Sequence, residues 1–278
     1  MAFETSCIGN ATHFIYSVFF SGDIEAIERI TYELCEDQAA QHVIYFEVRF
    51  SPHLLSNTWK HIFVEQAVPL DDPSAVTPDD AVLAVGRGLA RGERDFGVKS
   101  RMILCTIKGQ TGWSYDVVRM ATELEGVVAI DIAGDESRYS DEEKEAFEKA
   151  KELGIHRTVH AGEMGPATNV AYAVKKLHAE RIGHGYHVIQ DQYIYEECRR
   201  RDVHFETCPY SSYLTAAVRP YEKHAILTFA EDNANFSINK DDATQTKSTL
   251  DSEYELLRKQ GLNELHLVRA VSNEWRFY

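Results

Sequence analysis

The stretch HRTVHAGEMG (156–165) shows the pattern on which the fold prediction rests. A short apolar run leads directly into His160, and Glu163 follows three residues later in a glycine-containing segment. Buried strands do not normally end on an imidazole and a carboxylate unless something binds there, because burying such groups is costly. Binding sites at the carboxyl ends of strands are typical of parallel α/β folds.

Six further apolar runs repeat the beginning of this pattern along the chain. They lie at 43–50, 101–107, 127–134, 181–188, 204–211 and 234–241. Helical patterns separate them, with predicted helix starts at Thr77-Pro78 and Ser140 and a predicted stop at Gly154. Repeated strand and helix units with almost continuously apolar strands predict a parallel sheet covered by helices.

Two architectures fit such a sheet, the doubly wound sheet and the closed barrel. The glycine-rich phosphate loops G-x-G-x-x-G and G-x-x-x-x-G-K, typical of the doubly wound sheet, do not occur in the sequence. Polar residues at the ends of several runs favour a (β/α)8 TIM-type barrel. Seven strands are recognisable where closure needs eight, so we predict an incomplete barrel. It forms a single domain over 1–278, truncated or divergent at 1–22, with 57–76 as a surface loop.

Composition narrows the class of partner. Lys and Arg number 29 against 44 Asp and Glu, which gives a net charge of -15. This negative charge disfavours binding to nucleic acid and to anionic membrane surfaces. The apolar run at 14–20 is far shorter than the roughly 18 residues of a membrane helix. Five cysteines without a C-x-x-C spacing indicate a reduced, cytoplasmic setting. We expect a monomer that binds a small neutral or cationic molecule.

Polar residues and glycines follow four of the predicted strands. They are His160 with Glu163, His184 between Gly183 and Gly185, Asp241 with Asp242, and Gly134 with Asp135. Each has a structural explanation by itself: a core histidine, a solvated loop carboxylate, a helix cap, or a tight turn.

The joint occurrence of these residues favours a different explanation. In a barrel the strand ends converge on one cavity. Histidine nitrogen and aspartate oxygen are zinc ligands, and a catalytic zinc keeps one position open for water. A glutamate beside that water can move protons. The pattern therefore predicts metal-assisted hydrolysis.

Two other patterns in the sequence are weaker indications of a functional site. The series His204, Glu206 and Cys208 resembles in part the H-x-E…P-C-x-x-C signature of zinc deaminases that act on nucleobases, but the C-x-x-C half is missing, so the match is interpreted as accidental. Glu47 and Arg49 lie in one predicted strand and are interpreted as a buried ion pair at its end.

Longer blocks of the sequence resemble the adenosine deaminases of the animal type over residues 23 to 275. The blocks are VHAGEMG (159–165), ERIGHGYHV (180–188), HFETCPYSSYLT (204–215), FSINKDDATQTKSTL (236–250), FEVRFSPHLLSNT (46–58) and GERDFGVKSRMILC (92–105). The resemblance implies a (β/α)8 barrel with one Zn2+. It also implies the hydrolytic deamination of adenosine and 2'-deoxyadenosine to inosine and 2'-deoxyinosine, with a purine nucleoside as the partner.

The resemblance also implies roles for four of the residues already singled out. His160 and Asp241 would be zinc ligands. Glu163 would protonate the purine nitrogen N1 as water adds at C6. His184 would position that water and help to deprotonate it.

The resemblance implies that two further residues contact the substrate. Asp242 would hold purine N7, and the backbone of Gly134 would contact the base.

The family's first strand carries an H-x-H pair that completes the zinc site, whereas this sequence has no H-x-H, and His13 has no histidine two residues away. With His160 and Asp241 as the remaining ligands, we expect weak zinc binding. The alternative is a catalytically impaired isoform or fragment that keeps the purine pocket and acts as a nucleoside-binding or interaction protein.

Overall fold

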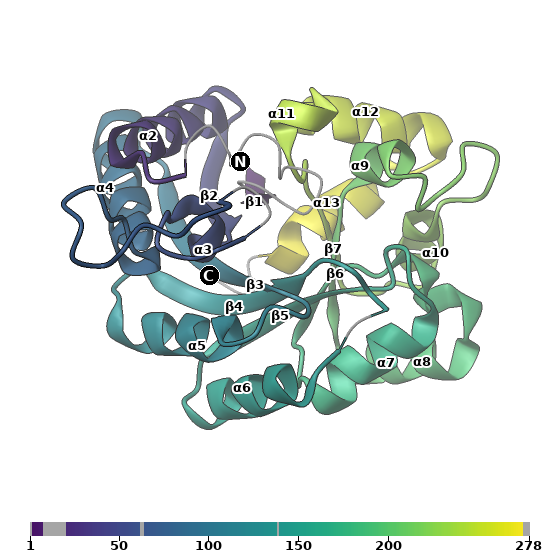
Figure 1. The fold of residues 1–278 in the computed structure, drawn as a ribbon. Helices are drawn as coiled ribbons and strands as arrows, with labels where there is room; N and C mark the ends of the chain where they lie inside the picture. The colour runs from purple at the N-terminus through teal and green to yellow at the C-terminus, as the bar shows by residue number, and fades with distance from the viewer. Residues whose placement is uncertain (1, 8–20, 62–63, 138, 275–278) are drawn as a thin grey trace.

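The computed structural model describes residues 2–7, 21–61, 64–137 and 139–274, and one parallel sheet of eight strands forms its centre (Figure 1). The strands follow one another in chain order around the sheet. They are β1 (Ala2–Cys7), β2 (Val43–Phe50), β3 (Lys99–Ile107), β4 (Val127–Ala133), β5 (His156–Ala161), β6 (Arg181–His184), β7 (His204–Thr207) and β8 (Phe236–Ile238).

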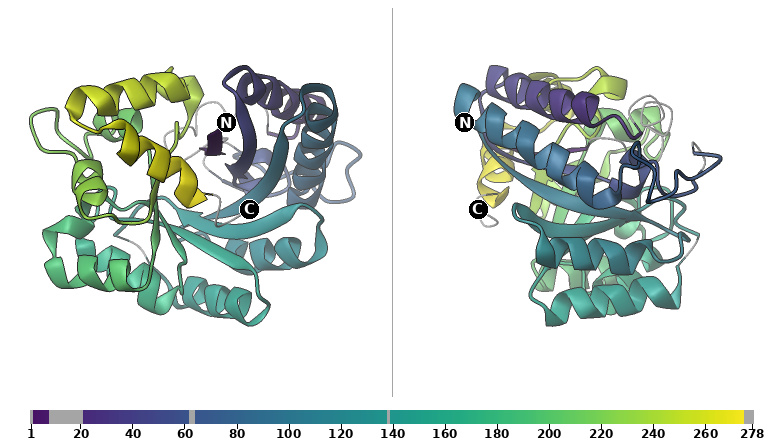
Figure 2. Two further views of the ribbon diagram at one scale, coloured as in Figure 1. Left: turned by 180° about the vertical axis from the view of Figure 1, so that it is seen from behind. Right: turned by 60° about the vertical axis from the view of Figure 1, so that its left-hand side comes forward.

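Helices surround the curved sheet on its outer side (Figures 1 and 2). They are α2 (Ile24–Ala40), α3 (Pro52–Leu55), α4 (Pro78–Phe96), α5 (Trp113–Glu123), α6 (Asp141–Glu152), α7 (Ala167–Lys176), η1 (Tyr186–Gln190), α8 (Gln192–Arg200), α9 (Pro209–Leu214), α10 (Ala225–Glu231), α11 (Ala243–Thr246), α12 (Leu250–Gln260) and α13 (Glu264–Glu274). None of the described helices is long and apolar enough to cross a membrane.

Local sequence explains where these helices begin and end. Thr77 and Ser140 form capping boxes at the first turns of α4 and α6, which confirms both predicted starts. α4 ends at Gly97, whose φ of 75° is left-handed. Gly154, with φ of 74°, follows the end of α6 as predicted.

The apolar core fills the space between the sheet and its helices. Apolar side chains on neighbouring strands, such as Val48 of β2, Leu104 of β3 and Ile132 of β4, pack in one cluster with helix residues such as Phe147 and Val170. All five are fully or almost fully buried. This packing holds the strand ends in fixed positions, which the site requires.

The predicted incomplete α/β barrel is confirmed, and its seven predicted strands correspond to β2 to β8. Three predicted runs were too long: 181–188 changes to a 3-10 helix after His184, 204–211 changes to α9 at Pro209, and in 234–241 only Phe236–Ile238 forms a strand. The 57–76 segment is irregular as predicted, apart from an isolated bridge between His61 and Val64.

The eighth strand, which was not recognisable from the sequence, is β1, and it pairs with β2 in parallel. Over the described residues, each strand pairs with the next from β1 to β8, and no ladder joins β8 to β1. Helix α13 contacts both β8 and β1, so it covers this seam (Figure 2). Such a cover keeps the open edges of the two strands from being fully exposed.

Candidate active site

The carboxyl ends of the strands enclose a small cavity. Its free volume is about 10 Å³, which is about the space that one water molecule needs. The lining residues are Arg49, His160, Gly183, His184, Glu206, Cys208, Asn239 and Asp241. The structure therefore brings together His160, His184 and Asp241, which belong to three different strand ends.

His160, near the end of β5, is oriented by a buried carboxylate. Its Nδ1 lies 2.8 Å from Oδ2 of Asp131 on β4, which in turn lies 3.3 Å from Nε of Arg49. Burial raises the pKa of Asp131, but the neighbouring His160 and Arg49 outweigh it and hold that pKa well below its usual range. A carboxylate beside one ring nitrogen is the arrangement that orients the histidine in carboxylate–histidine–metal triads.

The two glycines around His184 have separate steric reasons. A Cβ on Gly183 would lie 3.1 Å from Cγ of His160, so the glycine makes room for that ring. Gly185 has φ of 71°, and a Cβ there would lie 2.5 Å from Phe205. His184 itself has φ of 66°, a conformation that costs a non-glycine residue about 1–3 kcal/mol and is concentrated at functional sites.

Glu163 and Asp241 approach the same nitrogen of His184. Nε2 of His184 lies 3.6 Å from Oε2 of Glu163 and 4.0 Å from Oδ2 of Asp241. The Glu163 side chain is 22% exposed, so it reaches both the buried histidine and the solvent. Asp241 also has a left-handed φ of 60°, and its Oδ2 accepts a 2.6 Å hydrogen bond from Ser211. Two carboxylates thus flank one imidazole nitrogen at the strand ends.

A carboxylate that the sequence analysis missed holds the loop on which Glu163 lies. Glu136 follows β4, and its two oxygens accept hydrogen bonds from four consecutive backbone amides. The donors are the N–H groups of Gly162, Glu163, Met164 and Gly165, at 2.6, 2.9, 2.8 and 3.0 Å. Burial raises the pKa of Glu136, but the amides outweigh it and the pKa is lowered. The ionised carboxylate thus fixes the loop backbone.

Asp242 and Gly134 are not among the residues that line the cavity. Oδ1 of Asp242 accepts a 3.0 Å hydrogen bond from the Thr244 amide, so this aspartate caps α11, the structural alternative considered from the sequence. Gly134 follows β4 with φ of 102°, and a Cβ there would lie 3.3 Å from Ile107. Their contacts with a purine stay predictions.

A layer of buried charges, Glu47, Arg49, Arg181 and Glu206, lies inside the barrel next to the cavity. Arg49 pairs with Glu206 at 2.5 Å, and Arg181 pairs with Glu47 at 2.6 Å and with Glu206 at 3.2 Å. Burial raises the pKa of Glu206, but the two arginines outweigh it and lower that pKa to about 2. Glu47 and Arg49 thus both pair with residues from other strands.

Three donor atoms in the described part of the chain are grouped as metal ligands would be. A ring nitrogen of His184, Sγ of Cys208 and a carboxylate oxygen of Asp241 all lie within 4.8 Å of one another. Zinc accepts all three donor types. Cys208, which the sequence analysis had set aside, is therefore part of a donor set that fits a metal ion. His13 lies outside the described residues.

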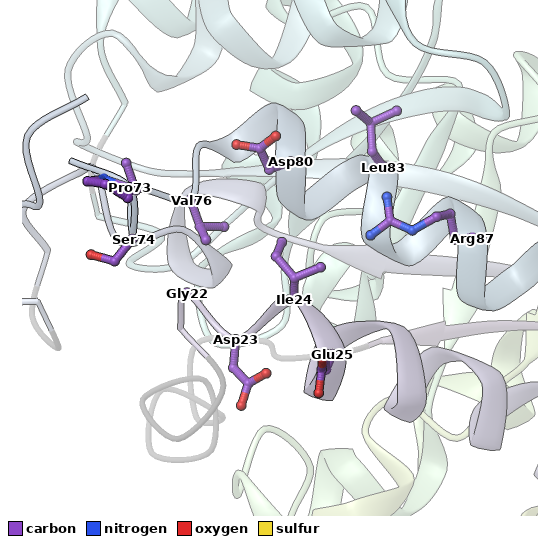
Figure 3. Close-up of a pocket in the computed structure, with 11 residues that line it drawn as sticks. Gly22, Asp23, Ile24, Glu25, Pro73, Ser74, Val76, Asp80, Leu83 and Arg87 are labelled. Carbon is purple, nitrogen blue, oxygen red and sulfur yellow. The ribbon is translucent and has the colours of Figure 1, made fainter. Parts of the chain in front are cut away.

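A larger hollow of about 660 Å³ lies between the start of α2, residues 73–76 and α4 (Figure 3). Three of its charged residues have structural roles: Asp23 caps α2, Asp80 belongs to the capping box of α4, and Arg87 pairs with Glu28 at 2.9 Å. No strand-end residue lines it. The small cavity, rather than this hollow, is therefore the candidate active site.

Comparisons with known proteins identify the family of this chain. The family model described as adenosine deaminase matches residues 10–276. Adenosine deaminase of Danio rerio is 46% identical over 262 residues, which cover 92% of this chain and 71% of the relative. Adenosine deaminase of Bos taurus is 43% identical over 266 residues, which cover 93% of this chain and 72% of the relative.

Two solved structures share the architecture. An adenine deaminase from Arthrobacter aurescens has a TM-score of 0.82 at 21% identity, covering 96% of this chain and 78% of its own. An amidohydrolase from Burkholderia ambifaria, solved with bound zinc, has a TM-score of 0.78 at 26% identity, covering 90% of this chain and 67% of its own.

Proposed function

Because the chain belongs to the adenosine deaminase family, we propose that it catalyses the zinc-dependent hydrolysis of adenosine and 2'-deoxyadenosine to inosine and 2'-deoxyinosine, with release of ammonia. The observation that supports this most directly is the approach of Glu163 and Asp241 to His184 at one strand-end cavity that His160 also lines. The groups proposed as proton donor, proton acceptor and metal ligands therefore lie near one another.

His160 and Asp241 would hold the metal. Asp131 orients the His160 ring through the 2.8 Å contact at Nδ1, and Ser211 fixes one oxygen of Asp241. When zinc is bound, it supplies a Lewis acid that lowers the pKa of a coordinated water. The deeply buried positions of both ligands exclude bulk water from this side of the cavity.

The remaining residues would manage protons and the base. Glu163, in its acid form, donates a proton to purine N1, which makes C6 electrophilic. His184 would accept a proton from the attacking water, and at 3.6 Å from Glu163 it is close enough for one water molecule to relay a proton between the two. Asp242 would contact N7, and Gly134, which has no side chain, would let the base approach the backbone after β4.

The cellular setting of this proposal is the cytoplasm, with the chain acting as a monomer in purine nucleoside metabolism. Four of its cysteines, Cys35, Cys105, Cys198 and Cys208, are buried thiols rather than disulfides. Thiols of this kind are typical of a reducing compartment.

The test is turnover of adenosine, followed through the ultraviolet change that accompanies inosine formation. The full chain purified with zinc should convert adenosine, and Glu163→Gln should lower kcat about 100-fold or more, because a neutral amide cannot donate the proton. Glu125→Gln, in an exposed turn before β4, is the matched control and should keep full activity. Adenosine that stays unchanged with the zinc-loaded chain would contradict the proposal, and so would a Glu163→Gln variant within tenfold of the parent.

A further inference from the structure

The parallel sheet opens between β4 and β5 on the side of the candidate active site. Every residue of both strands is described, yet the ladder between them ends at Ile130 and Arg157, before either strand ends. The ladder of β3 with β4 continues to the last residue of β4, and that of β5 with β6 continues to the last residue of β5. The carboxyl ends of β4 and β5 are therefore separated by a local split in the sheet.

Polar side chains, rather than strand pairing, connect the two sides of this split. Asp131 of β4 lies 2.8 Å from Nδ1 of His160 on β5. Glu136, which follows β4, accepts from the backbone amide of Glu163 in the loop after β5. Lys108, the residue after β3, makes the third connection, because its Nζ donates to the carbonyl oxygen of His160 at 2.8 Å.

Lys108 is itself fixed at both of its ends. Its backbone N–H donates to the carbonyl of Ala133 at 2.9 Å, which attaches its main chain to the end of β4. The residue is only 3% exposed, and its Nζ lies 4.9 Å from the centroid of the Tyr139 ring, within the range of a cation–π contact. A buried ammonium needs such partners, since removing its charge from water is costly.

We infer that Lys108 is a positioning residue that holds His160 in place across the split, an inference that rests on the metal-binding role proposed for His160. Asp131 orients the imidazole ring, whereas Lys108 fixes the backbone from which that ring extends. The β4 ladder offers the His160 carbonyl no replacement donor, because it ends three residues earlier, at Arg157. The lysine therefore helps to set where a metal bound to His160 would lie.

The alternative is a buried lysine that only stabilises the fold by packing on Tyr139. Zinc affinity separates the two roles, because packing alone affects folding and not the position of a ligand. Lys108→Met keeps the length of the side chain but removes the donor. In a titration of the metal-free chain with zinc against a chromophoric chelator, we expect this variant to bind zinc about tenfold more weakly than the parent, as when a ligand loses an outer partner. Lys108→Arg, which keeps charged donors, should bind zinc more tightly than Lys108→Met.

Arg157→Met is the matched control. Arg157 is also a buried cation that donates to a backbone carbonyl, that of His178 at 2.9 Å, but it lies near the start of β5 and contacts the segment before β6. This control should lose thermal stability and keep the parental zinc affinity. Equal zinc affinity in the parent and in Lys108→Met, or an equal loss in Lys108→Met and Arg157→Met, would overturn the inference.

A measurement on the parent chain covers the case in which Lys108→Met does not fold. Nuclear magnetic resonance of the zinc-loaded parent should show a scalar coupling between Nζ of Lys108 and the carbonyl carbon of His160, carried by the hydrogen bond that joins them. A zinc-loaded parent without this coupling would overturn the inference.

Turnover of adenosine by the same samples distinguishes this inference from the proposed function. A parent that deaminates adenosine, with Lys108→Met binding zinc as tightly, would overturn the role of Lys108 and leave the proposed function standing. A loss of zinc affinity confined to Lys108→Met, together with a parent that leaves adenosine unchanged, would support the inference and contradict the proposed function. A parent that binds no zinc would overturn both.

Discussion

Replacing Glu136 by glutamine tests whether the loop that carries Glu163 depends on one carboxylate. Oε1 accepts from the amides of Glu163, Met164 and Gly165, and Oε2 from the amide of Gly162. Glutamine keeps the length of the side chain but removes its charge. It also converts one oxygen into an NH2 group, which faces donors and cannot accept from them.

The size of the effect follows from these four bonds. A hydrogen bond to a charged group contributes about 1 kcal/mol more than a neutral one, so loss of the charge weakens the loop by at most about 4 kcal/mol. Glu136 is only partly buried, and the loop can relax toward water. We therefore expect the free energy of unfolding to fall by about 2 kcal/mol.

Two measurements on Glu136→Gln separate loop anchoring from general stability. Urea denaturation gives the loss in free energy of unfolding, and adenosine turnover in the absence of urea reports the placement of Glu163. We expect kcat to fall about 10-fold to 100-fold, because a displacement of about 1 Å at a catalytic group has this effect.

The matched control for Glu136→Gln is Glu142→Gln, which changes a carboxylate that accepts a single amide hydrogen bond, from Gly112 at 2.7 Å. This control should lose less than about 1 kcal/mol and keep its turnover. A Glu136→Gln variant with parental kcat and parental stability would refute the loop-anchoring argument.

Three further predictions concern the cavity and the charges beside it. Asp131→Asn should weaken zinc binding about 10-fold to 100-fold in a metal titration, because the His160 ring loses its orienting partner. Gly183→Ala should also weaken it, since the new Cβ would press on that ring at 3.1 Å. Glu206 has its pKa lowered from 4.5 to about 2, so its stabilisation is complete above pH 4.5 and is lost as the pH falls to about 2. At about 1.4 kcal/mol per pH unit, this loss amounts to about 3 kcal/mol, and Glu206→Gln should remove that part of the acid dependence in urea titrations at several pH values.

β2 to β4 could be predicted from their many apolar residues, as expected of buried parallel strands. β5 to β8 are shorter and carry polar residues beside their apolar ones. β1, AFETSC, has no apolar run longer than two residues and escaped prediction. It pairs with β2 through backbone groups, whose hydrogen bonds do not depend on side-chain pattern. The run at 181–188 was predicted too long because the left-handed turn at His184 and Gly185 leaves no mark in apolar periodicity.

The same limit applies to the site. His160, His184 and Asp241 could be predicted because each follows an apolar run, and the barrel rule then brings such ends together. Asp131 lies inside β4, where the sequence alone shows only one polar residue in an apolar run. Glu136 differs from an ordinary loop glutamate only in the hydrogen bonds that it accepts from backbone amides 26 or more residues away in the chain. Both are found only when neighbouring strands are placed in space.

Contact lengths separate the part of the barrel interior that is structural from the part that can bind. Within the layer of Glu47, Arg49, Arg181 and Glu206, the ion pairs measure 2.5 to 3.2 Å, so each charge there lies in direct contact with an opposite one. One step closer to the loops, His184 lies 3.6 Å from Glu163 and 4.0 Å from Asp241, too far for direct hydrogen bonds. Burying carboxylates and imidazoles at such separations is costly unless a further group lies between them. The proposed divalent cation would supply positive charge at that point, so the strand-end groups, rather than the paired charges, are the ones expected to bind a ligand.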